Sequence, residues 1–238
     1  MTPSSGDEPA LGYDARPREA RAVALVLHGG RSRSVAPVRA RQLAVLRMRP
    51  FARSLAHAGR AHGLVVARLR FRVRGWNGTE RSPVADAEWA LDRLGETYPG
   101  LPVGIVGHSM GGRTAVYAGG HEGVRSVVGL APWIEPGDPS RQLAGRGVLL
   151  VHGDADRMTS APASLQYAQQ LAGVAESVGY VSVQGDGHPM LRRPALWHEL
   201  ATGFTLAALC DASPERTVGA RTANILSRAL AGERPVVG

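Results

Sequence analysis

The sequence contains no lysine. All 28 basic residues are arginine, against 20 acidic residues, and the formal net charge is +8. Arginine codons are rich in G and C whereas lysine codons are rich in A and T, so this bias indicates a bacterial source with a GC-rich genome. A basic protein attracts anions of many kinds, and only motifs can tell which anion matters.

Cysteine and long hydrophobic runs are also scarce. The single cysteine, Cys210, excludes an internal disulfide framework, and the histidines lack the H-x-x-x-H spacing of a helical metal site. No apolar run is long enough to span a bilayer, and the first residues lack the basic and apolar regions of a signal peptide. We therefore expect a cytoplasmic protein that uses no metal or cofactor and does not insert into membranes.

Acidic residues are absent from one long segment. Residues 20–79 contain 13 arginines and no Asp or Glu, whereas the rest of the chain holds 15 arginines and all 20 acidic residues. Such a basic region attracts nucleic acid, acidic proteins or an anionic substrate. No nucleic-acid-binding motif accompanies the arginines, so we do not expect nucleic acid as a partner. A solvated arginine-rich face is the simplest interpretation, and an anionic substrate is the alternative.

Apolar runs alternate with helical patterns along most of the chain. This alternation is typical of an α/β fold with a mostly parallel sheet covered by helices on both faces. We expect one domain over residues 21–211, a partly ordered N-terminal extension over 1–20 and a tail with a weak helical pattern over 212–238. The predicted strands are 21–28, 64–71, 101–106, 124–130, 148–152 and 178–183, and the main helices are 38–59, 83–98, 161–171 and 191–209.

Two expectations follow from segment lengths. Only about twenty residues precede the first predicted strand, so an antiparallel strand pair at the start of the sheet should be short or absent. Between the strands 124–130 and 148–152 there is room for a loop and a helical turn only. We therefore expect no cap domain and an open site.

Ser109 stands in the most informative motif of the chain. Gly107-His108-Ser109-Met110-Gly111 follows the predicted strand 101–106 directly and precedes a helical segment. A strand, the pattern G-x-S-x-G and a helix form a nucleophile elbow, which presents the serine at the edge of the sheet. Glycines suit the positions where strand and helix cross, because a Cβ would clash there.

A nucleophilic serine needs a general base, and the base needs an acid to orient it. In folds with this elbow the three follow the order serine, acid, histidine. Asp154 and Asp156 follow one predicted strand, and His188 follows the last one in a glycine-rich loop. Either aspartate could orient His188. We favour Asp156, with Asp154 bracing the loop through backbone amides, and we expect His152 to be a packed, hydrogen-bonded histidine.

Over roughly residues 20 to 210 these motifs resemble the α/β-hydrolase superfamily. The resemblance rests on His28-Gly29-Gly30 as the oxyanion loop, the Gly107 to Gly111 elbow, Gly153-Asp154-Ala155-Asp156 as the acid loop and Gly187-His188 as the histidine loop. It implies a triad of Ser109, Asp156 and His188. The length looks most like the small lidless serine esterases and dienelactone hydrolases, although dienelactone hydrolases carry a cysteine where this chain has Ser109.

The oxyanion hole is expected from two backbone amides. One belongs to Met110, which follows the nucleophile, and the other to Gly30 or Arg31 in the loop after His28. The glycines of this loop would let its backbone come close to the substrate oxygen.

Residues that follow the strands at the same edge should line the substrate pocket. We expect Arg31, Trp76, His108, Trp133 and Met158 there, and we expect His108 to pack beside the site without taking part in proton transfer.

The arginine-rich loops at 31–33 and 72–74 should also open at this edge. Arginine binds carboxylates and phosphates through a planar fork of donors. We therefore expect an anionic ester, or a thioester carried on coenzyme A or an acyl carrier protein.

Together these features predict a serine hydrolase of carboxylic esters or thioesters. One alternative is an enzyme in which the same triad transfers or cyclises the acyl group. Another is a protein of this fold that binds ligands without turnover. The sequence does not determine the oligomeric state.

Overall fold

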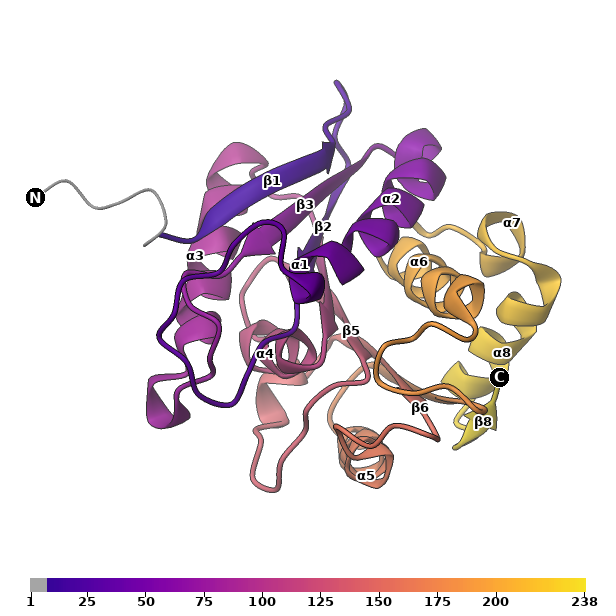
Figure 1. The fold of residues 1–238 in the computed structure, drawn as a ribbon. Helices are drawn as coiled ribbons and strands as arrows, with labels where there is room; N and C mark the ends of the chain where they lie inside the picture. Colours follow the sequence, from indigo (N-terminus) through magenta and orange to yellow (C-terminus); the bar gives the residue numbers. More distant parts are fainter. Residues whose placement is uncertain (1–7) are drawn as a thin grey trace, which may run out of the picture.

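Runs of apolar residues form the centre of a twisted sheet (Figure 1). The computed structural model describes residues 8–238. Within them the sheet has eight strands in the order β1-β3-β2-β4-β5-β6-β7-β8. Their bounds are β1 Ala10–Ala15, β2 Ala22–Leu27, β3 Leu64–Arg70, β4 Val103–His108, β5 Val124–Leu130, β6 Gly147–Gly153, β7 Ser177–Val183 and β8 Val236–Val237. All neighbouring pairs are parallel except β1 with β3, so the predicted α/β class with a mostly parallel sheet is confirmed.

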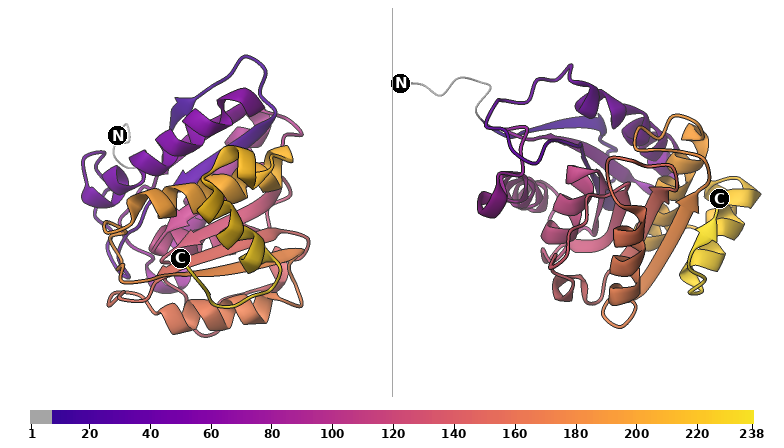
Figure 2. Two further views of the ribbon diagram at one scale, coloured as in Figure 1. Left: turned by 90° about the vertical axis from the view of Figure 1, so that its right-hand side faces the viewer. Right: turned by 60° about the horizontal axis from the view of Figure 1, so that its bottom comes forward.

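Helices cover both faces of this sheet (Figure 2). One face packs against α3, α4 and α5, and the other against α2, α6 and α8. Because the central strands are buried on both faces, their sequences are apolar at consecutive positions. The helices are α1 Leu43–Arg47, α2 Arg49–Ala58, α3 Ser82–Thr97, α4 Met110–Ala118, α5 Ala161–Leu171, α6 Pro194–Cys210, α7 Pro214–Thr217 and α8 Ala220–Leu230, with short 3-10 turns at Gly59–His62, Gly78–Glu80 and Arg141–Leu143.

The structure differs from the predicted elements at the two edges of the sheet. β1 pairs antiparallel with β3 and lies in the segment predicted as an N-terminal extension, whose residues 1–7 lie outside the described residues. β8 pairs with β7 at the other edge, and α8 packs on β7 and α6. Neither strand was predicted, because each is defined by pairing with a strand far away in the chain, and β8 has only two residues.

The long helix predicted over 38–59 is divided. α1 ends at Arg47, Met48 separates the two helices, and α2 begins at Arg49. Pro50 lies in the first turn of α2, where its missing N–H leaves no intrahelical hydrogen bond unmade. Proline therefore starts the second helix here.

The strand order brings four loops together at one edge of the sheet. β4, β5, β6 and β7 are neighbours and parallel, so the segments that follow them leave from the same side. The connection from β5 to β6 contains a single 3-10 turn, Arg141–Leu143, within the described residues, and no cap domain is inserted there. No helix of residues 8–238 combines the length and the apolar character needed to cross a membrane.

Candidate active site

Ser109 lies between β4 and α4 in a conformation that serine seldom adopts. Its backbone has φ 56° and ψ −119°. The crossing of strand and helix is so close that a Cβ on Gly107 would lie 2.1 Å from the carbonyl oxygen of Gly111, and a Cβ on Gly111 would lie 2.5 Å from that of His28. The two glycines are therefore required by the turn, and the turn holds Ser109 at the edge of the sheet.

Asp156 and His188 are joined by a hydrogen bond. His188 Nδ1 lies 2.8 Å from Asp156 Oδ2, and both side chains are almost completely buried. Since the carboxylate accepts from Nδ1–H, the tautomer assigned to His188 leaves Nε2 free to accept a proton. His188 and Ser109 line the same pocket. No hydrogen bond connects their side chains among the described residues, and such bonds are often long in unliganded enzymes.

Asp156 is held by further donors. Its Oδ1 accepts from the amides of Met158 at 2.7 Å and Thr159 at 3.0 Å, and its Oδ2 accepts from the Thr159 hydroxyl at 2.9 Å. Burial alone would raise the pKa of Asp156, but hydrogen bonds from His152, His188 and these amides hold that pKa well below its usual range. The carboxylate is therefore ionised and fixed in orientation.

His152 contacts the same oxygen of this carboxylate as His188. Its Nε2 lies 3.3 Å from Asp156 Oδ2, and its Nδ1 lies 2.9 Å from the hydroxyl of Ser164. The sequence analysis expected a packed histidine here but missed its contact with Asp156 and the central place of Thr159, whose hydroxyl is 3.1 Å from His188 Nδ1. Both residues adjoin Asp156 in sequence at the end of β6, and this proximity was the available signal.

Asp154, the competing acid, does not contact His188. Its side chain is exposed at the molecular surface, and Oδ1 accepts a 2.6 Å hydrogen bond from the amide of Gly185. This contact ties the loop after β6 to the loop after β7. Asp154 therefore braces the two loops that carry Asp156 and His188.

His108 lies behind His188 and away from the pocket. Its ring is buried and 4.7 Å from the His188 ring, and its Nε2 lies 3.0 Å from the carbonyl oxygen of His188. Burial and the neighbouring His188 lower the pKa of His108 to about 3. The ring stays neutral near pH 7 and supports the loop of His188 by donating from Nε2.

The backbone amides of two residues in the pocket lining have no hydrogen-bond acceptor within residues 8–238. Among the described residues, neither the Gly30 nor the Met110 amide donates to a backbone oxygen outside its own element, and both residues line the pocket with Ser109. The Arg31 amide, the other candidate, donates to the carbonyl of Arg74 at 2.8 Å. A Cβ on Gly30 would lie 2.4 Å from the backbone carbonyl oxygen of Arg74, so only glycine fits at this close approach.

The pocket around Ser109 is open and has a volume of about 540 Å³. Of the predicted wall residues, the structure places Arg31, Trp133 and Met158 in its lining, but not Trp76 or His108. The remaining members of the lining are Gly30, Ser32, Arg33, Ser109, Met110, Thr159 and His188. No carboxylate lines the pocket, so Arg31 and Arg33 leave it positively charged.

Trp76 is buried behind the pocket wall, where it contacts Arg113 and Trp133. The guanidinium carbon of Arg113 lies 4.4 Å from the centre of the Trp76 ring and 4.6 Å from the centre of the Trp133 ring, and the two indoles meet edge to face. The same guanidinium pairs with Asp138 at 2.7 Å and with Glu135 at 2.9 Å. Sequence analysis missed Arg113, since nothing in its local pattern distinguishes it from a surface arginine.

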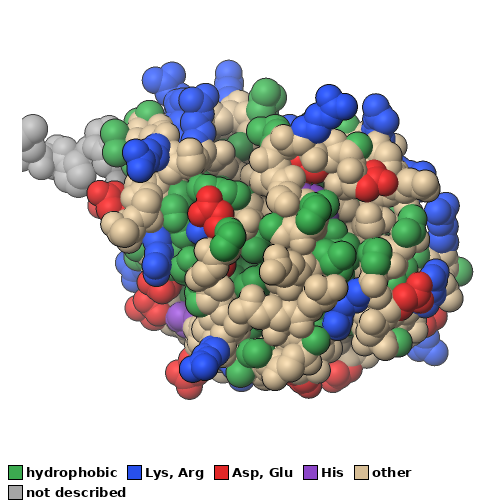
Figure 3. Space-filling view, turned by 90° about the horizontal axis from the view of Figure 1, so that it is seen from below, with side chains coloured by type: hydrophobic (Ala, Val, Ile, Leu, Met, Phe, Trp, Pro, Cys, Tyr) green, Lys and Arg blue, Asp and Glu red, His purple; other side chains and the backbone are tan. Residues whose placement is uncertain are grey.

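Arg72 and Arg74 do not line the entrance. Arg72 pairs with the buried Asp86 at 2.5 Å, and Arg74 donates to the carbonyl of Pro37 at 3.0 Å. Figure 3 shows that basic side chains are spread around the edge of one face, with acidic side chains among them, and do not gather in one patch there.

Within residues 8–238, no three His, Cys, Asp or Glu side chains lie together in a way that could hold a metal ion.

Comparison with solved structures shows where this fold occurs. Est1E of Butyrivibrio proteoclasticus, solved with ferulic acid bound, is 14% identical with a TM-score of 0.62 over 84% of this chain and 95% of that chain. XC6422 of Xanthomonas campestris, described as a serine hydrolase without a lid, is 17% identical with a TM-score of 0.60. The match covers 87% of this chain and 94% of that chain. The Pyrococcus furiosus esterase Pf2001 is 16% identical with a TM-score of 0.63 over 80% and 83%.

The family assignment comes from the sequence itself. None of the curated proteins matches the chain. The family model described as alpha/beta hydrolase fold matches residues 57–181, which is more than half of the sequence and includes the elbow and Asp156. The chain belongs to the alpha/beta hydrolase fold family.

Proposed function

We propose that this protein is a serine hydrolase that cleaves a carboxylic ester or thioester through an acyl-enzyme on Ser109. The observation that carries the proposal is the 2.8 Å hydrogen bond between Asp156 Oδ2 and His188 Nδ1, at the wall of the pocket that Ser109 also lines. A histidine fixed in this tautomer has Nε2 available as a general base.

In the first step Ser109 Oγ attacks the carbonyl carbon and His188 Nε2 takes its proton. The negative oxygen that develops accepts hydrogen bonds from the amides of Gly30 and Met110, which have no protein acceptor within the described residues. The C–O or C–S bond then breaks, and His188 returns the proton to the leaving alcohol or thiol. Water, deprotonated by His188, attacks the acyl-enzyme and releases the acid and free Ser109.

The walls of the pocket favour a substrate with two parts. Trp133 and Met158 offer apolar surface, whereas Arg31 and Arg33 offer charge. Ferulic acid, which Est1E was solved with, is an aromatic acid of a size that such an open pocket admits. We therefore expect an ester of a small apolar or aromatic acid whose other part carries a negative charge, which a guanidinium would hold.

A fluorophosphonate probe tests the nucleophile. The wild-type protein should be labelled covalently, Ser109→Ala should not be labelled, and His188→Ala should be labelled far more slowly because the general base is missing. Ser32→Ala is the matched control, since Ser32 lines the same pocket and should leave labelling unchanged. Labelling of Ser109→Ala at the wild-type rate would place the nucleophile elsewhere.

A panel of p-nitrophenyl esters and acyl thioesters tests the reaction. We expect release of the free acid in water, and the same yield of acid when a second alcohol is added. An acyl group found mainly on the added alcohol would identify a transferase. If Ser109 is labelled by the probe but no ester or thioester is turned over, the alternative of a protein that binds ligands without turnover is supported.

A further inference from the structure

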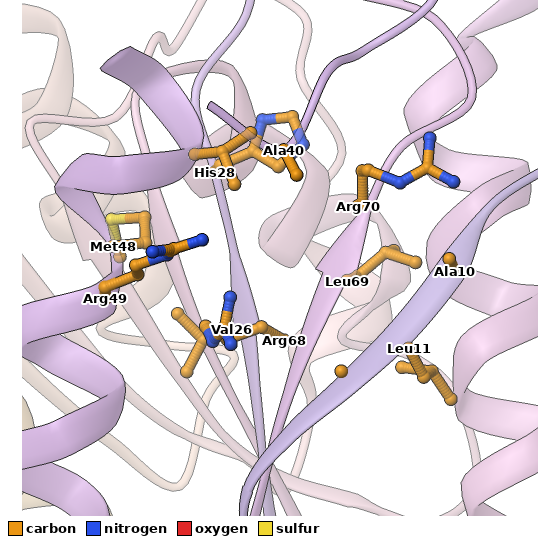
Figure 4. A pocket seen from close by; sticks show the side chains of 12 residues that line it. Ala10, Leu11, Val26, His28, Ala40, Met48, Arg49, Arg68, Leu69 and Arg70 are labelled. Carbon is orange, nitrogen blue, oxygen red and sulfur yellow. The ribbon is translucent and has the colours of Figure 1, made fainter. Parts of the chain in front are cut away.

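A second cavity lies on the α2 face of the sheet, beneath the edge strand β1 (Figure 4). Its volume is about 270 Å³, and none of its lining residues belongs to the pocket around Ser109. Val26 and Met48 belong to the core on this face and give the wall its larger apolar side chains, and Ala10, Ala40 and Val45 also line it. Leu11 and Leu69 border the cavity as well, but they pack into the core on the opposite face of the sheet. The cavity therefore offers an apolar surface to whatever enters it.

Three arginines supply the charge of this cavity. Arg49, Arg68 and Arg70 line it, no Asp or Glu does, and Figure 4 shows the guanidinium groups of Arg49 and Arg70 on opposite sides. His28 also lines the cavity but adds no charge, because burial lowers the pKa of His28 to about 4. Both ring nitrogens of His28 are already used by the backbone, at Gly29 and Phe71.

The three guanidinium groups differ in what neutralises them. Arg68 forms an ion pair with Asp14. Arg70 donates to the uncharged carbonyl oxygens of Val38 at 3.1 Å and Glu8 at 3.3 Å. Arg49 has no hydrogen-bond or ion-pair partner among residues 8–238, and its Nε is buried. Arg49 therefore brings to the cavity wall a positive charge that no described carboxylate neutralises, and an anion in the cavity would supply the counter-charge.

We propose that this cavity is a binding site for a small carboxylate with an apolar body. The guanidinium fork of Arg49 would hold the carboxylate oxygens, with Arg70 adding charge from the other side. The apolar body would contact Val26 and Met48. The volume is below the roughly 300 to 1,000 Å³ of sites for drug-sized ligands, so the ligand is smaller than these.

Calorimetric titration of the wild-type protein with hexanoate tests the site. For a ligand of this size we expect a Kd on the order of 1 mM. Hexanol, which has the same chain without the charge, should bind much more weakly. Equal binding of hexanol, or no heat from hexanoate at roughly ten times that concentration, would overturn the proposal.

Two variants locate the bound hexanoate. Arg49→Gln should weaken binding by about tenfold or more, the loss expected for one charge-assisted hydrogen bond. Gly12→Val should abolish binding by filling the cavity, because a Cβ at Gly12 has only Arg68 Nη2 nearby, at 3.8 Å, and the strand should accept it. An unchanged melting temperature shows that each variant is folded.

The catalytic pocket provides the control. Arg31→Gln should leave the hexanoate Kd unchanged, because Arg31 lines only the other pocket. If hexanoate binding is lost in Arg31→Gln and survives Gly12→Val, hexanoate occupies the catalytic pocket and the proposed site is refuted. None of these measurements depends on turnover, so they stand whether or not the protein is a hydrolase.

Discussion

The partners of polar side chains differ between two regions of the sheet. At the edge formed by β4 to β7, buried polar groups are partners of one another: Asp156 accepts from His188 and from Thr159, and Arg113 pairs with Asp138. Beside β1 to β3, Arg68 pairs with Asp14, whereas Arg70 donates to backbone carbonyls and Arg49 has no partner within the described residues. The first arrangement fixes orientation, and the second leaves charge available.

This difference predicts where substitutions will matter. A group whose partners are buried with it cannot be replaced without leaving one of them unsatisfied, so its loss is severe. A charge near solvent is screened and replaceable, so its loss is mild and depends on salt. The predictions below test this contrast, from the largest expected effect to the smallest.

The two aspartates after β6 give the sharpest test. Asp156→Asn should lower kcat by about four orders of magnitude, because an amide cannot hold His188 in the required tautomer. Asp154→Asn changes the same atoms two residues away and should lower kcat by less than about tenfold, since Asp154 contacts only the Gly185 amide. Steady-state kinetics on one p-nitrophenyl ester measures both, and similar losses would contradict the assignment of Asp156.

Arg113 tests the partnered region by stability. Arg113→Met should lower the free energy of unfolding by about 3 kcal/mol, because it leaves Asp138 buried without its cation. Denaturant titration measures the loss. The double variant with Asp138→Asn should recover part of it, since the uncompensated charge is then removed. If Arg113→Met has the stability of the wild-type protein, the ion pair between Arg113 and Asp138 does not stabilise the fold.

The lowered pKa of the buried His108 predicts that the stability of the fold depends on pH. Its folded pKa of about 3 lies below the ordinary 6.5, so between these values the unfolded chain binds a proton that the folded protein does not. Stability therefore falls as pH decreases through this window, by about 1.4 kcal/mol per pH unit for one such group. His108→Asn should reduce the slope, whereas His57→Gln, at an exposed position on α2, should not. Equal slopes in all three proteins would contradict the burial of His108 as a neutral ring.

The arginines of the catalytic pocket should give the smallest effect. For an anionic ester, kcat/KM should fall by up to about fivefold as salt rises, because exposed charges are screened beyond about 10 Å at 0.1 M. A neutral ester of equal size should show no such fall, and Arg31→Gln with Arg33→Gln should remove the difference. If both esters respond alike in the wild-type protein, these arginines do not select the substrate.

The parts of the site that the sequence predicted are those fixed by local chemistry. Gly107 and Gly111 are visible in the sequence because no other residue fits the crossing at the elbow. Asp156 and His188 are visible because each follows a buried strand, and parallel strands deliver their ends to one edge. Spacing alone could not choose between Asp154 and Asp156, and the choice depended on a loop conformation.

The features that were missed depend on partners far away in the chain. Arg72 was expected at the entrance but turns toward Asp86, fourteen positions on, and Trp76 is buried because Arg113 and Trp133 cover it. β1 exists only through its pairing with β3. A side chain's direction on a loop is set by these tertiary contacts, and no periodic pattern in the sequence encodes it.

In the loop after β5, the backbone and the side chain of Trp133 make contacts with different parts of the site. Its backbone serves the reacting residues, since the Trp133 amide donates to the Ser109 carbonyl at 3.1 Å and the Ala131 carbonyl accepts from Thr159 at 3.2 Å. The Trp133 side chain instead faces the pocket. A new side chain at position 133 would keep both backbone contacts and change the pocket wall, together with the contact that the indole makes with Arg113. Under the proposed function, residue 133 is therefore the position at which a substitution would change the acyl groups that fit the pocket while leaving the backbone contacts of Ser109 in place.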